Sequence, residues 1–198
     1  MNESTYRMLA VVIFLVGAGI SGYFRRRADR RAGGEQILLT AEGLPLMLTL
    51  RVGGAALWLG VFAYLINPAW MAWSQLHLPT WLRISGAALG VVADGLMYWV
   101  FSSLGDNVTP TVVTRSKHHL VTSGPYRWVR HPLYSVGFLS FIAFALLSAN
   151  WYIAALAIVA MIAMSLRVPK EEAALIARDG ELYREYAQRT GRFLPKLG

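Results

Sequence analysis

Long apolar stretches alternate with short polar connections along most of the 198-residue chain. A helix that crosses the hydrocarbon layer of a bilayer needs about 20 predominantly apolar residues, because the layer is roughly 30 Å thick. Four stretches reach or approach this length, and a fifth is shorter. They are Met8 to Phe24, Leu44 to Ile66, Ile84 to Leu104, Leu133 to Ala149, and the shorter Trp151 to Leu166. The pattern therefore predicts an all-α, polytopic membrane protein with five transmembrane helices.

Only Asn150 separates the fourth stretch from the fifth. One continuous helix over residues 133–166 would be about 50 Å long, too long for a single crossing. We therefore expect a tight helical hairpin that turns near Asn150. Its arms contain alanines and serines, which allow helices to pack closely in a membrane.

The charged residues predict an orientation. Hydrophobic residues make up 56% of the chain and charged residues 15%, and the net charge is +8. The cations gather in residues 25–31, 106–131 and 167–198, whereas residues 67–80 contain none. Because cationic loops usually face the cytoplasm, we expect the amino terminus outside and the carboxyl terminus in the cytoplasm, in a bacterial inner membrane or the endoplasmic reticulum. Membrane lipids, including anionic ones, are expected partners and nucleic acid is not.

Two further features limit the chemistry. The sequence contains no cysteine, which excludes disulfides, thiolate catalysis and cysteine-ligated metals. The cations of the first apolar stretch follow it rather than precede it, so we interpret this stretch as a mature helix and not as a secretory signal.

Residues 167–198 are polar and predict a cytoplasmic helical tail against the mouth of the bundle. Pro169 suits the first turn of a helix, and Glu171 and Glu172 then lie near the positive end of its dipole. Gly180 is a candidate break in this helix. The apolar residues fall roughly on one face. They are Leu175, Ile176, Leu182, Tyr183 and Tyr186.

Two ionisable residues lie deep in predicted helices. Arg51 is in the second apolar stretch and Asp94 is in the third. A lone charge at such depth is costly and usually faces protein or water, so we expect both to face the interior of the bundle, where they could pair. For Arg51 the alternative is a side chain that extends to the membrane interface. For Asp94 it is a neutral, hydrogen-bonded carboxylic acid in the core.

A polar motif, SGPYRWVRHPLY at residues 123–134, directly precedes the fourth apolar stretch. Gly124 and Pro125 predict a turn, and Pro132 fits the first position of the helix that follows. The free amide groups at a helix start attract anions. Basic side chains add positive charge around this helix start. They are Lys117, Arg127, Arg130 and His131. For Arg127 we favour the simpler interpretation of an anchor to lipid headgroups.

Further motifs extend this pattern. The run HHLVTSGPYRWVRHPLY is followed, after the predicted hairpin, by RVPKEE, then GELYREY and finally RFLP. This combination, over residues 115–195, resembles the isoprenylcysteine carboxyl methyltransferase family of integral membrane enzymes. RHPxY alone is shared with related membrane methyltransferases and sterol reductases, whereas the whole set at these spacings is more specific. The chain departs from the family pattern where Ser135 and Val136 precede Gly137.

The resemblance implies S-adenosylmethionine as the methyl donor, bound at the cytoplasmic side and not on a soluble Rossmann domain. It divides the chain into amino-terminal helices and a basic loop (residues 1–114) and a catalytic region (residues 115–198). Matching positions give the expected cofactor site. They are His118, His119, Leu120, Val121, Tyr126, His131, Pro132, Leu133, Tyr134 and Glu171, together with Gly124 and Arg130 of the same motif. The resemblance assigns Arg167 to the methyl acceptor.

The acceptor decides which residues are catalytic. A carboxylate is ionised near neutral pH and needs no general base, and the planar guanidinium of Arg167 suits it. An amine needs a base, for which His131 and Glu172 are the candidates. Without the resemblance, Arg167 is explained as an anchor that closes the fifth helix, and Glu171 and Glu172 as helix caps.

The leading hypothesis is a membrane methyltransferase that acts on a lipophilic acceptor. An isoprenylcysteine-type carboxylate is the first candidate, and a phospholipid amine and a small thiol are alternatives. An NADPH-dependent membrane reductase of the sterol reductase type and a non-enzymatic scaffold are the competing hypotheses. No metal site is expected, because the histidines at 118, 119 and 131 lack a nearby carboxylate to complete a ligand set. The oligomeric state is left open.

Overall fold

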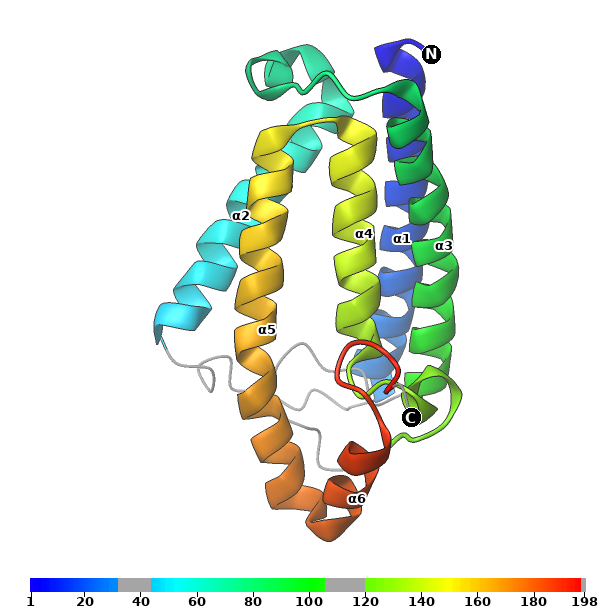
Figure 1. Ribbon diagram of the computed structural model, residues 1–198, viewed down its shortest axis with the longest axis vertical. Coiled ribbons are helices and arrows are strands. Elements are labelled where there is room, and N and C mark those ends of the chain that lie inside the picture. Colours follow the sequence, from blue (N-terminus) through cyan, green and yellow to red (C-terminus); the bar gives the residue numbers. More distant parts are fainter. Residues whose placement is uncertain (32–43, 106–119, 197–198) are drawn as a thin grey trace.

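The structure is a computed structural model that describes residues 1–31, 44–105 and 120–196. These ranges form a helical bundle whose long helices run along one axis (Figure 1). The elements are α1 (Glu3–Arg31), α2 (Leu44–Ile66), η1 (Pro68–Ser74), α3 (Thr80–Leu104), η3 (Gly124–Arg127), α4 (Pro132–Ser148), α5 (Trp151–Asp179) and α6 (Glu181–Arg189). The predicted all-α, polytopic membrane fold is confirmed.

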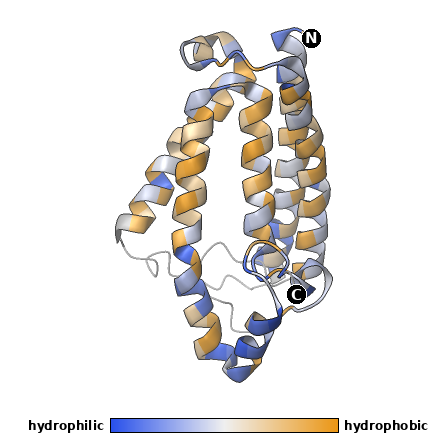
Figure 2. Ribbon diagram, in the orientation of Figure 1, coloured by the Kyte–Doolittle hydropathy of each residue, from blue (hydrophilic) through white to orange (hydrophobic). Residues whose placement is uncertain are grey.

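The apolar helices differ in length. Helices α1, α2, α3 and α5 are long and apolar enough to cross a membrane, whereas α4 has 17 residues and is the shorter apolar helix. The sequence predicted that the fifth crossing is the short one. This is wrong because α5 continues past Leu166 into the polar tail and ends at Asp179. Figure 2 shows the change along α5 from hydrophobic residues to hydrophilic ones near its lower end.

The predicted helix start at Pro169 is also wrong, because Pro169 lies inside α5. A proline removes one hydrogen bond of a helix, yet the helix continues through Pro169. The neighbouring Val168 is fully buried, so this part of α5 is packed inside the protein. At 1.5 Å per residue the helix is about 44 Å long, so its last turns extend beyond a hydrocarbon layer of roughly 30 Å. Glu171 and Glu172 thus lie beyond the apolar part of α5. Gly180, with φ +59°, ends α5, as expected.

The hairpin between α4 and α5 turns at Ala149 and Asn150. Ala149 adopts the left-handed conformation with φ 48°. The side chain of Asn150 caps α5 by accepting a 3.1 Å hydrogen bond from the backbone nitrogen of Ile153. It also donates a 2.8 Å hydrogen bond to the hydroxyl of Ser74 in η1. The expected tight turn near Asn150 is confirmed, and η1 covers it.

A buried ion pair joins four helices at the upper end of the bundle. Arg83 of α3 makes two hydrogen bonds to Glu3 of α1, of 2.7 Å and 2.9 Å. The hydroxyl of Tyr64 in α2 donates to the same carboxylate at 2.9 Å. Arg83 Nε donates to the carbonyl of Leu147 in α4 at 3.0 Å. One guanidinium thus fixes the spacing of α1, α2, α3 and α4.

The two deep ionisable residues lie in different surroundings. Asp94 is 9% exposed and faces α1, where a Cβ atom on Gly17 would lie 2.7 Å from Oδ1 of Asp94. Arg51 is exposed on α2. The expectation that both face the bundle interior is therefore correct for Asp94 and wrong for Arg51. An exposed Arg51 agrees with the alternative of a side chain that extends to the interface.

Candidate functional site

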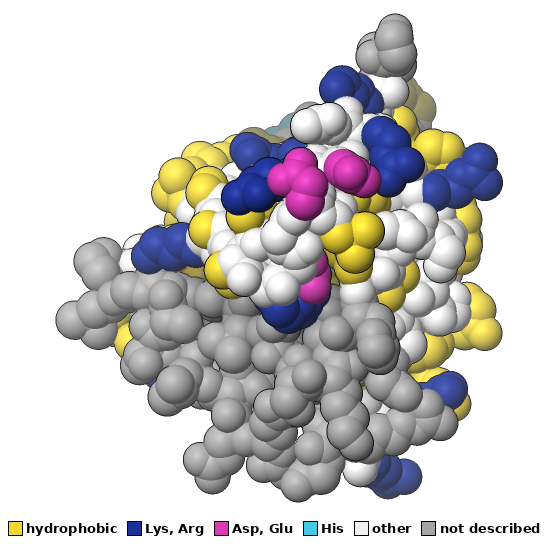
Figure 3. All heavy atoms as spheres, turned by 90° about the horizontal axis from the view of Figure 1, so that it is seen from below, with side chains coloured by type: hydrophobic (Ala, Val, Ile, Leu, Met, Phe, Trp, Pro, Cys, Tyr) yellow, Lys and Arg dark blue, Asp and Glu magenta, His cyan; other side chains and the backbone are white. Residues whose placement is uncertain are grey.

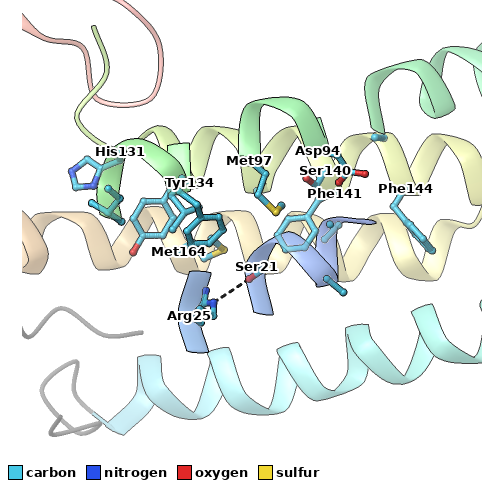
Figure 4. A pocket seen from close by; sticks show the side chains of 18 of the residues that line it. Ser21, Arg25, Asp94, Met97, His131, Tyr134, Ser140, Phe141, Phe144 and Met164 are labelled. Carbon is cyan, nitrogen blue, oxygen red and sulfur yellow. Dashed lines mark hydrogen bonds between the residues drawn. The ribbon is translucent and has the colours of Figure 1, made fainter. Parts of the chain in front are cut away.

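A cavity of about 750 Å³ extends along the inside of the bundle, within the usual size of small-molecule sites. Helices α1 to α6 all contribute to its wall, and its two ends differ in polarity. The apolar end is lined by residues that include Ile13, Phe14, Leu57, Phe144, Leu147 and Ile153. The polar end is lined by residues that include Arg25, Arg130, His131, Tyr134, Glu171 and Tyr183. Figure 4 shows His131 and Tyr134 toward one end of this hollow and Phe144 toward the other.

The motif of residues 123–134 forms η3 and the start of α4. Gly124 has φ +60°, and a Cβ atom there would lie 2.4 Å from Oγ of Ser103, so this turn requires glycine. Tyr126 is buried, and its carbonyl accepts a 2.7 Å hydrogen bond from the hydroxyl of Tyr186 in α6. This contact fixes η3 on α6 and places Tyr126 at the cavity wall. Pro132 is at the first position of α4, as predicted.

The last described segment folds back onto the same motif. The backbone nitrogen of Arg130 donates a 2.8 Å hydrogen bond to the carbonyl of Gly191. The backbone nitrogen of His131 donates a 3.1 Å hydrogen bond to the carbonyl of Arg192. These bonds position the segment that follows α6 beside the start of α4. The geometry of the polar end therefore depends on residues more than fifty positions apart in the chain.

Glu172 is the centre of an ion cluster behind the cavity. Its carboxylate accepts hydrogen bonds from Arg130 Nε at 2.9 Å and Arg192 Nη2 at 2.9 Å, and it lies 3.2 Å from Nε2 of His131. Burial alone raises the pKa of Glu172, but the hydrogen bonds from His131, Arg130 and Arg192 outweigh it and lower the pKa to about 2. A carboxylate with so low a pKa is a weak base.

Glu171 points to the cavity instead. Its Oε2 accepts a 2.9 Å hydrogen bond from the hydroxyl of Tyr134 and lies 3.7 Å from Nδ1 of His131. All three residues line the cavity, whereas Glu172 is not among its lining residues. The sequence left open which of the two glutamates contacts a cofactor. The geometry favours Glu171 for the cavity and Glu172 for the ion cluster.

Two arginines line the cavity from different helices. Arg167 lies on α5, and Arg25 lies on α1 and donates a 3.1 Å hydrogen bond to the hydroxyl of Ser21 (Figure 4). The charge of Asp29 attracts Arg25, and that of Arg167 repels it. Two cations that share one hollow form a site suited to an anionic group. Sequence reasoning missed Arg25, because it belongs to a run of five arginines that was interpreted as a topology signal.

Tyr183 of α6 is a second residue that sequence reasoning missed as a site residue. Its side chain is buried with 2% exposure and lines the cavity. Among the described residues none is a hydrogen-bond partner for its hydroxyl. Burial raises the pKa of this hydroxyl, and the carboxylate of Glu172 adds to the effect, so the group is a hydrogen-bond donor at neutral pH. The predicted amphipathic face of the tail contained Tyr183 but gave no sign that this residue lines a cavity.

The structure brings most of the predicted site residues to the cavity. Those that line it are Leu120, Val121, Tyr126, Arg130, His131, Leu133, Tyr134, Arg167 and Glu171. Gly124, Pro132 and Glu172 are not lining residues and shape the surrounding backbone or ion cluster. His118 and His119 lie outside the described residues. Within the described ranges, no three histidine, aspartate or glutamate side chains are grouped as metal ligands.

Comparisons with known proteins agree with the motifs. Residues 86–177 match the isoprenylcysteine carboxyl methyltransferase (ICMT) family. Protein-S-isoprenylcysteine O-methyltransferase of Homo sapiens is 32% identical over 126 residues, which cover 62% of this chain and 44% of the human protein. Nickel-cobalt-cadmium resistance protein NccN of Alcaligenes xylosoxydans xylosoxydans is 34% identical over 83 residues, which cover 42% of this chain and 39% of that protein. The chain thus spans less than half the length of these relatives.

The fold is similar to that of a solved membrane protein. A structure of the eukaryotic intramembrane Ras methyltransferase ICMT superposes with a TM-score of 0.56 at 19% identity, over 94% of this chain and 67% of that chain. At this identity the likeness concerns the fold, and it includes helices that the sequence motifs do not cover. The family match contains most of α3, all of α4 and most of α5, which form much of the cavity wall. Residues 86–177 are therefore similar to the isoprenylcysteine carboxyl methyltransferase family, in agreement with the motifs of this region.

Proposed function

We propose that this protein is an integral membrane methyltransferase that transfers the methyl group of S-adenosylmethionine to the carboxylate of a lipophilic acceptor. The observation that carries the proposal is the single cavity that joins a polar end to an apolar end. A polar, charged donor and a lipophilic acceptor can meet only in a site that offers both surroundings. The match of residues 86–177 to a methyltransferase family, and the similarity to a human protein named an O-methyltransferase, support it.

The residues at the polar end suit the cofactor. Tyr126, Tyr134 and Tyr183 line this end and offer aromatic faces to a cation. Glu171 offers a carboxylate to the hydroxyl or amino groups of a nucleoside or amino acid. His118 and His119 are included in the proposed cofactor site on the family motif alone.

The two arginines suit the acceptor. Arg25 and Arg167 line the cavity from α1 and α5, so a carboxylate between them is held by two guanidinium groups. Such a grip also relieves the repulsion between the two cations. An amine acceptor needs a general base. Of the two candidates, Glu172 already binds two arginines outside the cavity, which leaves His131 in the cavity wall for an amine.

The transfer step then requires no proton movement. A carboxylate oxygen uses a lone pair to bond the methyl carbon, and the carbon–sulfur bond breaks with its electron pair on sulfur, which leaves a methyl ester and neutral S-adenosylhomocysteine. One negative and one positive charge disappear together. The tasks of the chain are therefore to align the two reactants and to exclude water. The apolar end of the cavity, walled by α1, α2 and α3 as well as by α4 and α5, contributes the exclusion of water.

We place the polar end at the cytoplasmic side. Seen from the lower end, the described surface carries several Lys and Arg side chains around its rim (Figure 3). Cationic ends of membrane proteins favour the cytoplasm. In this orientation the amino terminus is outside, and the cavity is close to the leaflet from which a lipid-anchored acceptor arrives.

Ligand-induced stabilisation tests this function. The detergent-purified protein is heated with S-adenosylhomocysteine, with NADPH or with neither, and its apparent melting temperature is measured. A ligand that binds only the folded form must raise this temperature. Stabilisation by S-adenosylhomocysteine alone is the expected result. Stabilisation by NADPH alone indicates a reductase, and no stabilisation by either indicates a scaffold.

A further inference from the structure

The carboxyl group of Asp94 lies in the wall of the cavity toward its apolar end. Asp94 is on α3, outside the polar sequence motifs, and only 9% of the residue is exposed. Figure 4 shows it at the level of Ser140 and Phe141, away from His131. The opposing helix α1 has glycine at position 17, and any side chain there would collide with Oδ1 of Asp94. The packing of α1 against α3 thus leaves room for this carboxyl group.

Nothing in the described part of the chain donates a hydrogen bond to Asp94. Two hydroxyl groups also line the cavity. That of Ser140 donates to the carbonyl of Val136 at 2.9 Å, and that of Ser21 accepts from Arg25 and makes no hydrogen bond to Asp94. A buried carboxyl group without a donor costs free energy. If Asp94 only filled space between the helices, an apolar residue would do so without this cost in free energy.

A ligand bound in the cavity can supply the hydrogen-bond donor that Asp94 lacks. Asp94 is one of the lining residues, together with Phe141, Met97 and Gly90 around it. A ligand that fills the apolar end therefore passes this carboxyl group. A plain hydrocarbon chain leaves it unsatisfied, whereas a hydroxyl or ammonium group at the right depth satisfies it and gains a charge-assisted hydrogen bond.

We infer that Asp94 selects an acceptor whose lipophilic part carries a hydrogen-bond donor, a hydroxyl or an ammonium group, at some distance from its carboxylate. This inference rests on the proposed function for the place of the carboxylate, between Arg25 and Arg167. Arg25 lies eight positions after Gly17, the residue opposite Asp94, which is about 12 Å along a helix. The acceptor is therefore an amphiphile of medium length with one polar group at each end of this interval.

Three medium-chain carboxylates of equal length test the inference. One is unsubstituted, one carries a terminal hydroxyl and one carries a terminal amine. Their affinities are measured by displacement of a fluorescent fatty acid from the detergent-purified protein, with saturating S-adenosylhomocysteine present. We expect the wild type to bind the hydroxylated or aminated compound about tenfold more tightly than the unsubstituted one, because hydrogen bonds to charged groups have this strength.

Variants separate recognition from folding. Asp94→Leu should lose the preference and bind the unsubstituted chain at least as well as the wild type does. Asp94→Asn keeps an acceptor oxygen without the charge, so it should retain a preference for the hydroxyl and lose one for the amine. Val91→Leu, at an exposed position of α3 that does not line the cavity, is the control and should retain the wild-type preference.

Two results overturn the inference. One is equal binding of the three carboxylates by the wild type, and the other is an unchanged preference in a folded Asp94→Leu variant. Stabilisation by S-adenosylhomocysteine is measured on the same samples. If it persists while the preference is absent, the assignment of Asp94 is wrong and the proposed methyltransferase function stands. If it is absent from the wild type, the proposed function itself fails.

Discussion

The hydroxyl of Tyr134 donates a 2.9 Å hydrogen bond to Oε2 of Glu171, between the first turn of α4 and the polar extension of α5. The two residues are 37 positions apart and belong to different motifs, RHPLY and RVPKEE. Both line the polar end of the cavity. The hydrogen bond orients the carboxylate of Glu171 relative to the ring of Tyr134. Each side chain thus holds the other in position before a ligand binds.

Loss of this hydrogen bond should weaken cofactor binding. We expect Tyr134→Phe to lower the affinity for S-adenosylhomocysteine about tenfold, because a hydrogen bond to a charged group is removed. Glu171→Gln should have a comparable effect. Titration calorimetry on the detergent-purified protein measures both. Tyr98→Phe is the control, since Tyr98 is an exposed tyrosine on α3. Affinities equal to that of the wild type would exclude Glu171 and Tyr134 from the cofactor site.

The ion cluster around Glu172 should make the stability of the folded protein depend on pH in the acidic range. The pKa of Glu172 is about 2 in the folded protein, below its ordinary 4.5. A carboxyl group with a lowered folded pKa contributes stability that is complete above the unfolded pKa and is lost as the pH falls toward the folded pKa. The apparent melting temperature of the wild type should therefore decrease as the pH falls below about 4.5.

Glu172→Gln is the variant that isolates this effect. It should be less stable than the wild type at neutral pH and should lose less stability on acidification, because its side chain cannot titrate. Glu181→Gln, which removes an exposed glutamate, should follow the wild-type curve. Parallel curves for the wild type and Glu172→Gln would show that the cluster does not stabilise the fold.

The two cavity arginines should act on the acceptor. We expect Arg25→Gln and Arg167→Gln to raise the KM for a lipophilic carboxylate tenfold or more, because each removes one charge-assisted contact to the acceptor. Stabilisation by S-adenosylhomocysteine should be retained. Arg26→Gln makes the same charge change at the neighbouring exposed position and should leave KM unchanged. A loss of cofactor stabilisation in Arg167→Gln would move this residue from the acceptor to the cofactor.

The ion pair at the upper end should serve stability and not ligand binding. Arg83→Gln leaves the carboxylate of Glu3 and the carbonyl of Leu147 without their donor. We expect it to lower the free energy of unfolding by about 3 kcal/mol, near the lower limit for a buried pair, since the side chain of Glu3 is 30% exposed. Unfolding in mixed micelles with a denaturing detergent measures the loss. The shift caused by S-adenosylhomocysteine in the surviving folded protein should match that of the wild type.

The sequence alone predicted the helices, the hairpin and most of the polar wall. The length of an apolar stretch is tied to the thickness of a bilayer, and the turn at Asn150 follows from a chain too long for one crossing. Gly124, Pro132 and Gly180 have the conformations that their residue types favour, in a turn, at a helix start and at a helix end. These are local properties, and local properties are readable along the chain.

The end of α5 was not predictable in this way. Pro169 has the local character of a helix start, yet the helix passes through it because Val168 beside it is buried. The cost of a proline in a helix is a local quantity, whereas the burial that offsets it depends on neighbours from other helices.

Only the tertiary structure decided which charged and polar groups share the cavity. Arg25 and Arg51 look alike in the sequence, as basic residues of apolar helices, and both are exposed, but of the two only Arg25 lines the cavity. Glu171 and Glu172 are adjacent, and successive positions of a helix point in directions about 100° apart, so one reaches the cavity and the other the ion cluster. Asp94 could be expected to face inward from its depth alone. In the structure Asp94 lies against a glycine of α1 and has no hydrogen-bond donor among the described residues. This environment depends on the packing of two helices whose contacting residues are more than seventy positions apart, which no local pattern encodes.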